Sequence, residues 1–379
     1  MGLGSEIDLM AFYTFQALIL GTALLTIARQ NGKWRAYSTL YVLVWTLTVI
    51  AIKFKYGAEQ STFYSYDQET QLEMYDRLLQ NGLLLSPQTF VADRYLIIVP
   101  VRLLNIFGIE PILATKFLQA ICLLLLYRVC VKFLESNNLT VKLAHAIFFA
   151  GPLFIFMSTL GLRDLEIALA ATYFFIGKSI FLKQLSLLLL FPLRPHLAVA
   201  LIFGWLASKY FKRFSFKNIY LVLVFVTVFA FAVGGYGFII GRNLRDGNAV
   251  VAPEIFQQDA WWRYISNLVG LQFLSLDDRT VNFSVVRLLA LRLFFVDSFL
   301  VPICFVITLM AQKIEHSVLR VQVFLSFTFF LGLAAQTDFN STRQNLPFLS
   351  TMGVLALLGL LKRNNEVKNS EPTKVASVK

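Results

Sequence analysis

The sequence predicts an all-α polytopic membrane protein with about nine to eleven transmembrane helices, one re-entrant or broken hairpin and two long outer loops. Three observations predict this class. Of the 379 residues, 57% are hydrophobic, and the mean hydropathy is +0.67. Apolar runs of about 20 residues, the length that crosses a hydrocarbon core, recur from one end of the chain to the other. We therefore exclude a soluble protein at this stage.

The predicted spans are apolar stretches near the length that a helix needs to cross a bilayer. They comprise residues 9–27, 37–52, 111–131, 139–158, 165–182, 219–240, 286–309, 318–336 and 345–361. Residues 185–191 and 197–207 are too short to cross, and Pro192 and Pro195 break the helix between them. We interpret this pair as a re-entrant hairpin. Residues 95–107 are expected to form a short helix at the interface or against other spans.

Basic residues near the span ends indicate the orientation, because Lys and Arg are retained in the cytoplasm. If the hairpin returns to the side from which it came, all the basic clusters fall on one face. These clusters are Arg29, Lys33 and Arg35; Arg128, Lys132 and Lys142; Lys178 and Lys183; Lys209, Lys212, Arg213 and Lys217; Lys313 and Arg320; and Lys362 and Arg363. The N-terminus is then outside and the C-terminus inside.

The domain organisation follows from this topology. Residues 1–362 are expected to form a single transmembrane domain, with outer loops at about 53–94 and 241–285. Residues 363–379 are polar and are expected to form a disordered cytoplasmic tail. Because the long loops both lie on the outer face, we expect any large chemistry there.

Arginines also occur on the expected outer face, where the insertion rule disfavours them. They are Arg163, Arg194, Arg242, Arg245, Arg263 and Arg343. A charge near membrane depth costs on the order of a few kcal/mol unless it is paired or lines a watery cavity, so these residues are candidates for function. Arg163 and Arg194 lie at the ends of apolar segments, where guanidinium groups could hold the two phosphates of a lipid diphosphate. The alternatives are interfacial snorkelling or a structural pair of Arg163 with Asp164 or Glu166.

Two residues are candidates for proton transfer. His196 lies beside Arg194 at the tip of the predicted hairpin, and it could accept a proton or hydrogen-bond a sugar or phosphate oxygen. Its alternative role is that of a packing residue beside a helix break. Asp67 follows an aromatic cluster in the first outer loop and precedes a predicted helix, where an N-cap or a positioned base would be found. Its alternative role is that of an acid on an exposed amphipathic helix.

The sequence indicates no metal and no cofactor. Cys122, Cys130 and Cys304 lie within apolar runs and lack the CxxC or Cys/His spacing of a metal site. The chain also lacks a phosphate-binding glycine loop, an HExxH motif and a nucleophile elbow. A nucleotide-driven pump and a membrane metalloprotease are therefore unsupported.

Residues 157–207 resemble the middle of EpsG-type and Wzy-type bacterial polysaccharide polymerases. In that family a span opens with a short G-x-R motif, which Arg163 matches, and the next apolar segment carries a histidine, which His196 matches. The family usually has a glutamine or a similar residue after the arginine, whereas this chain has Asp164. The acidic, aromatic loop around Tyr66 and Asp67 also resembles that of GT-C glycosyltransferases.

Both resemblances imply a bacterial inner-membrane protein whose active site lies on the periplasmic, outer face. The implied activity is that of a polymerase or glycosyltransferase that transfers a glycan from a polyprenyl (di)phosphate carrier to a saccharide acceptor. The product would be a surface polysaccharide such as O-antigen, capsule or exopolysaccharide. Arg163 and Arg194, with Arg242, Arg245 or Arg343, would hold the diphosphate, while Asp67 or His196 would take the acceptor proton.

Other functions remain open at this stage. The nearest alternative is a GT-C transferase that adds a single sugar from a polyprenyl monophosphate donor. A lipid-linked sugar transporter or flippase would be favoured by paired broken helices, of which we find a single example. A purely structural membrane scaffold is the third alternative. The partners expected are polyprenyl-linked saccharides, the lipid bilayer, a chain-length regulator and a flippase, and no nucleic acid.

Overall fold

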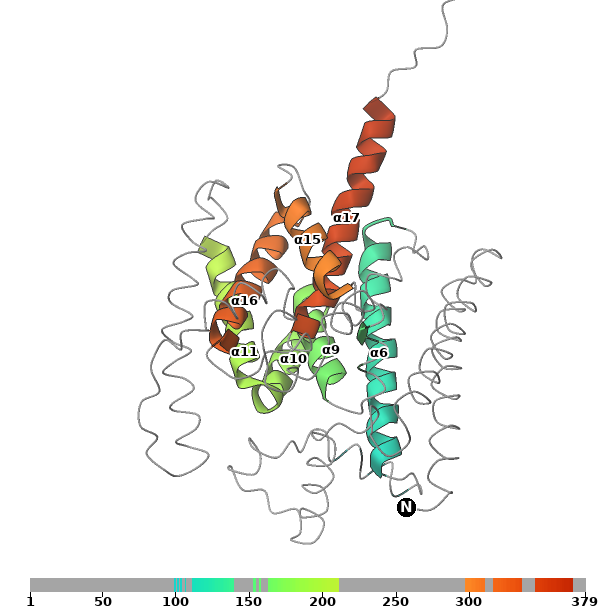
Figure 1. The fold of residues 1–379 in the computed structure, drawn as a ribbon, viewed down its shortest axis with the longest axis vertical. Helices are drawn as coiled ribbons and strands as arrows, with labels where there is room; N and C mark the ends of the chain where they lie inside the picture. The colour runs from blue at the N-terminus through green and yellow to red at the C-terminus, as the bar shows by residue number, and fades with distance from the viewer. Residues whose placement is uncertain are drawn as a thin grey trace, which may run out of the picture.

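The computed structural model describes residues 111–139, 163–210, 297–310, 316–335 and 345–370, together with residues 99, 101, 103, 106, 153, 154 and 157. The helices in these ranges are α6 (Pro111–Ser136), α9 (Asp164–Ile176), α10 (Ile180–Leu193), α11 (Pro195–Tyr210), α15 (Asp297–Met310), α16 (Ser317–Ala335) and α17 (Leu346–Ser370). Figure 1 shows them as one bundle, with α6 and α17 as its longest members. Among these described helices, none meets the combined length and hydropathy required of a membrane span.

Helices α9 and α10 form a tight hairpin that closes at residues 177–179. Gly177 ends α9, and a Cβ at this position would collide with the ring and carbonyl of Tyr173. Ser179 caps α10, because its hydroxyl accepts a hydrogen bond from the backbone N–H of Leu182 at 3.4 Å. Lys183 then donates to the carbonyl of Phe175 at 3.1 Å, which satisfies an acceptor at the end of α9.

A second break separates α10 from α11. Arg194 takes φ −159° and ψ 81° between the two helices, as expected for a residue that precedes proline. Pro195 begins α11, the position at which proline is best tolerated, while Pro192 lies inside the last turn of α10. The chain therefore makes two reversals of direction between α9 and α11.

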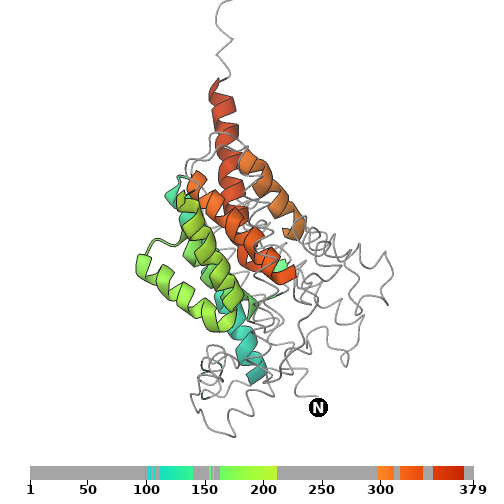
Figure 2. The ribbon, with the colours of Figure 1, turned by 90° about the vertical axis from the view of Figure 1, so that its left-hand side faces the viewer.

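Helix α11 packs closely against α16. A Cβ at Gly204 would meet the Ser326 hydroxyl, the Gln322 carbonyl oxygen at 2.7 Å and the Ser326 nitrogen at 2.8 Å. Glycine is therefore required here because the two backbones approach too closely for any side chain. The Phe203 and Phe329 rings stack beside this crossing, with their centroids 4.2 Å apart. Figure 2 shows the two helices side by side.

Helix α17 occupies the middle of the bundle, where it contacts α6, α9, α15 and α16. Phe348 packs against Phe175 of α9 and against Phe327 and Phe330 of α16. The Thr172 and Ser350 hydroxyls share a hydrogen bond of 2.5 Å within this apolar region. This bond satisfies two polar groups that would otherwise be costly to bury.

Arg320, in the first turn of α16, joins this helix to α15 and α17. Its side chain is 1% exposed. It donates to the Thr308 hydroxyl of α15 at 2.9 Å and also to the Leu355 carbonyl of α17. The sequence placed Arg320 in a basic cluster at the membrane surface, whereas the structure gives it buried partners, because its guanidinium can serve two acceptors on different helices.

The described basic residues of the predicted cytoplasmic clusters gather toward one end of the bundle. The end of α6 lies beside the start of α16, where Asn137 and His316 share a hydrogen bond of 2.8 Å. Because α11 and α16 run in opposite directions, α11 also ends at this end of the bundle (Figure 1). Arg163 and Arg194 lie at the other ends of α9 and α10.

Helix bounds differ from the predicted spans in particular places. The span predicted at 165–182 ends as a helix at Ile176, because Gly177 and Ser179 form a turn. Helix α17 continues to Ser370, into residues 363–379, which were expected to be disordered, and no proline interrupts it between Pro347 and Pro372. The predicted spans at 9–27, 37–52 and 219–240, both long loops and most of the span at 139–158 lie outside the described residues.

Candidate functional site

Arg163 and Arg194 come together at one end of the α9–α10 hairpin. Arg163 precedes α9, and Arg194 separates α10 from α11. Arg194 Nη2 lies 3.4 Å from Asp164 Oδ1, and these two side chains are 9% and 3% exposed. A buried ion pair of this kind is costly to break by the loss of one partner. A structural pair of Arg163 with Asp164 or Glu166 was the alternative to phosphate binding. The structure shows Asp164 paired with Arg194, and the charge of Arg163 acts on Glu166.

Helix α6 supplies a glutamine to the same region. Gln119 is 1% exposed, and its Nε2 donates to Glu166 Oε1 at 2.8 Å. Its Oε1 accepts from the backbone N–H of Leu165 at 3.1 Å. Gln119 therefore satisfies one of the first N–H groups of α9, which have no acceptor within the helix. Asp164 also places negative charge at the positive end of the α9 dipole.

His196 joins this group from the first turn of α11. Its ring stacks on Phe330 of α16, with the centroids 5.5 Å apart and the planes at 17°. Desolvation lowers the pKa of His196, and the positive charges of Arg194 and Arg163 lower it further. His196 is an exposed residue, so solvent moderates this shift. The imidazole is therefore neutral near pH 7, the protonation state that a general base needs, and its lowered pKa makes it a weaker base than an unperturbed histidine.

We call Gln119, Arg163, Asp164, Glu166, Arg194 and His196 the polar cluster. It combines two guanidinium groups, two carboxyl groups, an amide and a neutral imidazole, contributed by α6, α9, α11 and the residues that border them. This set can hold an anionic oxygen through the arginines and can exchange a proton through the histidine.

The structure brings together only part of the predicted site. Arg163, Arg194 and His196 belong to the polar cluster. Asp67, Arg242, Arg245 and Arg343, together with Arg263, lie outside the described residues. Their relation to the cluster therefore stays a prediction.

Sequence reasoning did not single out Gln119, and it treated Glu166 merely as a pairing partner. The available signal was a polar residue within an apolar run, since Gln119 falls inside the span predicted at 111–131. The described residues contain no group of three His, Cys, Asp or Glu residues that could hold a metal ion. Cys122, Cys130 and Cys304 are free thiols.

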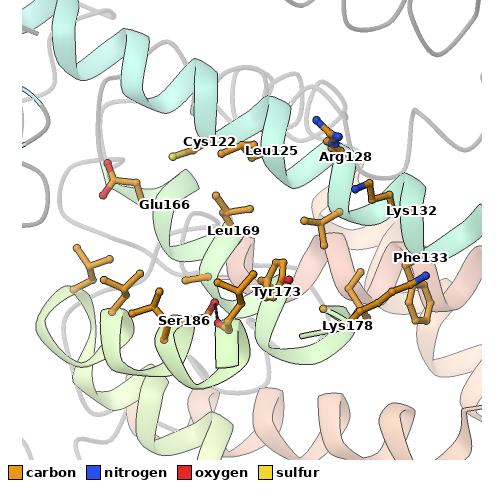
Figure 3. A pocket seen from close by; sticks show the side chains of 18 of the residues that line it. Cys122, Leu125, Arg128, Lys132, Phe133, Glu166, Leu169, Tyr173, Lys178 and Ser186 are labelled. Carbon is orange, nitrogen blue, oxygen red and sulfur yellow. Dashed lines mark hydrogen bonds between the residues drawn. The ribbon is translucent and has the colours of Figure 1, made fainter. Parts of the chain in front are cut away.

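An apolar groove of about 540 Å³ runs between α6, α9 and α10 (Figure 3). Glu166 of the polar cluster lines one end of it, and Arg128, Lys132 and Lys178 line the other. Leucine side chains make up much of the wall between these ends. The groove therefore connects two charged regions through a largely hydrocarbon surface.

Comparison with known proteins adds no relative. No protein-family model matches the chain, and neither does any curated protein or solved structure.

Proposed function

We propose that this chain is a membrane glycosyltransferase of the polysaccharide-polymerase type. It transfers a glycan from a polyprenyl diphosphate carrier to a hydroxyl of a second lipid-linked saccharide, at the periplasmic face of a bacterial inner membrane. The observation that carries this proposal is the meeting of Arg163, Arg194 and His196 in the polar cluster, although they belong to different elements.

Exposed apolar side chains on α10 support a bilayer environment for this protein. Along α10, Ile180 is 75% exposed, Phe181 67% and Leu188 65%. Large apolar side chains exposed along one helix in this way fit contact with lipid. The hydropathy of the whole sequence leads to the same proposal.

The chemistry needs few groups, because a diphosphate is already a good leaving group. The acceptor hydroxyl attacks the anomeric carbon of the donor sugar, and the bond from this carbon to the phosphate oxygen breaks. The electron pair of that bond stays on the diphosphate, whose negative charge the arginines offset. The hydroxyl proton passes to the His196 imidazole or to Asp67.

Asp164 determines how Arg194 acts in this mechanism. In the absence of substrate, Asp164 compensates the charge of Arg194 within a region that excludes water. A diphosphate would compete with this carboxylate for the guanidinium. The pair thus keeps Arg194 in place between turnovers.

The test compares the surface glycan of a null strain with strains that express wild type, Arg163→Ala, Arg194→Ala, His196→Ala or Asp67→Ala at matched levels. Lys209→Ala is the matched control, because Lys209 is an exposed cation at the far end of α11. We expect the null strain and both arginine variants to keep single repeat units and to lose the long ladder on a gel, while the control keeps the ladder.

Other outcomes identify the alternatives. A repeat unit that lacks one sugar would indicate the single-sugar GT-C transferase. A full ladder in the null strain would overturn the proposal. Lipid-linked repeat units that accumulate on the cytoplasmic side would indicate a transporter instead.

A further inference from the structure

The apolar groove between α6, α9 and α10 ends in three cations that the proposed reaction does not use. Arg128 and Lys132 are four residues apart, and therefore lie on the same face of α6. Lys178 lies in the turn between α9 and α10. All three are exposed and line the groove, and Figure 3 shows them toward the end opposite Glu166.

These charges are not compensated within the part of the chain that the structure describes. Those residues provide no ion pair to Arg128, Lys132 or Lys178. Glu135, an acid on the same stretch of α6, does not line the groove. The acid that does line it, Glu166, hydrogen-bonds Gln119 at the other end. The three cations therefore place net positive charge at one end of the apolar groove.

The walls of the groove suit a hydrocarbon chain. Leu118 and Leu125 of α6 face Leu169 of α9 and Leu185 and Leu189 of α10 across it. Leu125 is 46% exposed and Leu185 39%, so the groove reaches the surface of the bundle. Its volume of about 540 Å³ falls within the usual range of small-molecule pockets.

We propose that this groove binds one anionic glycerophospholipid, with an acyl chain between α6, α9 and α10 and the phosphate held by Arg128, Lys132 and Lys178. A free anion could use the cations but not the groove, and a neutral lipid could use the groove but not the cations. The phosphate site lies at the opposite end of the α9–α10 hairpin from Arg163 and Arg194, so it is distinct from the polar cluster. In the expected topology it faces the cytoplasmic leaflet, whose anionic head groups attract clustered Lys and Arg.

This inference goes beyond the proposed function. It requires that the groove meet a bilayer, but it does not require that the protein transfer sugars. If this protein binds the lipid but makes no polysaccharide, the lipid-binding inference stands and the proposed glycosyltransferase function fails.

The test measures lipid binding to the purified full-length protein by native mass spectrometry in detergent. Wild type is titrated with phosphatidylglycerol, with phosphatidylcholine of the same acyl chains, and with inorganic phosphate. We expect one bound phosphatidylglycerol per protein, weaker binding of phosphatidylcholine, and no displacement by inorganic phosphate.

Two variants examine the two halves of the site. The triple variant Arg128→Gln, Lys132→Gln, Lys178→Gln should weaken phosphatidylglycerol binding by at least about tenfold, because each cation near the head group contributes separately. Ala170→Phe, which fills the groove from α9, should weaken binding of both lipids. A charge-matched control, Lys209→Gln, Lys212→Gln, Arg213→Gln, removes the same net charge from another basic cluster and should bind as wild type does.

Several results would overturn the inference. They are equal affinity for the two lipids, an unchanged affinity in the triple variant, an equal loss in the charge-matched control, and displacement of the lipid by inorganic phosphate. If Ala170→Phe fails to fold, the triple variant and its control still decide the question. Both replace cations of the predicted basic clusters, and those that the structure describes are exposed.

Discussion

The ion pair between Asp164 and Arg194 combines a structural role with the role proposed for Arg194 in binding phosphate. Both side chains are almost fully buried, and their closest atoms are 3.4 Å apart. A buried charge that loses its partner destabilises a fold, whereas the replacement of both partners by apolar residues is often neutral. Stability and activity can therefore be measured independently at this position.

We expect Asp164→Asn to lower the free energy of unfolding by about 3–5 kcal/mol, because it leaves Arg194 buried without its anion. The double variant Asp164→Leu, Arg194→Leu should recover most of this stability. Thermal unfolding of the purified protein measures both effects. Under the proposed function, the double variant should still fail to extend the glycan ladder, because it lacks a phosphate-binding arginine. A ladder that returns with the stability would show that Arg194 is purely structural.

His196 should make the stability of the protein depend on pH. The ordinary pKa of histidine is 6.5, and desolvation together with Arg194 and Arg163 lowers it in the folded state. Between the two pKa values the unfolded chain binds a proton that the folded chain does not, so stability falls as the pH falls through this window. We expect His196→Gln to lose less stability than wild type from about pH 7 to about pH 5. Unfolding midpoints at a series of pH values measure this, and parallel curves for the two proteins would contradict it.

At the scale of the element, the contact between α11 and α16 depends on the absence of a side chain at Gly204. Any Cβ there would come within 2.7 Å of the Gln322 carbonyl and 2.8 Å of the Ser326 nitrogen. These are backbone atoms of a packed helix, and they cannot move without shifting α16. The stacked pair of Phe203 and Phe329 lies beside the same contact.

We therefore expect Gly204→Val to destabilise the protein by about 1–3 kcal/mol through overpacking. The loss should appear as a lower unfolding temperature in detergent. Val199→Ala is the matched control, because Val199 lies on the same helix and is 42% exposed. Its substitution should change stability by less than about 0.5 kcal/mol. Equal effects of the two variants would argue against a close helix crossing at Gly204.

At the scale of the whole molecule, charge is distributed unequally between the two ends of the described bundle. The cations Arg128, Lys132 and Lys178 lie toward one end, and the polar cluster lies toward the other. If the bundle crosses a bilayer, the positive-inside rule assigns the first end to the cytoplasm. The α9–α10 hairpin then extends between the two leaflets.

This topology is testable by cysteine labelling. In a background that lacks Cys122, Cys130 and Cys304, we expect Pro195→Cys to react with a membrane-impermeant maleimide added to spheroplasts. Lys178→Cys should react only after the membrane is opened, because it lies in the turn at the opposite end of the hairpin. The labelled protein is detected on a gel. Labelling of both positions from outside, or of Lys178→Cys alone, would contradict the proposed orientation.

The sequence by itself determined several local features of this protein. The apolar runs located α6 and α16, whose first residues, Pro111 and Ser317, lie within one residue of the predicted span starts. Pro192 and Pro195 located the break at Arg194, since the residue before a proline avoids helical geometry. Arg163, Arg194 and His196 stood out because charge and imidazole are costly beside apolar segments.

Only the tertiary structure decided which groups meet. Asp164 pairs with Arg194, Gln119 reaches Glu166, and Arg320 is enclosed by α15 and α17. These contacts join residues between 12 and 47 positions apart in the chain, and sequence periodicity specifies the face of a helix but not the helix that covers it. The turn at Gly177 was missed for a different and local reason. Its backbone is not left-handed, and the glycine is required by the approach of Tyr173, four residues earlier. Local chemistry therefore determined the helices and the candidate residues, while packing alone decided which candidates share a site.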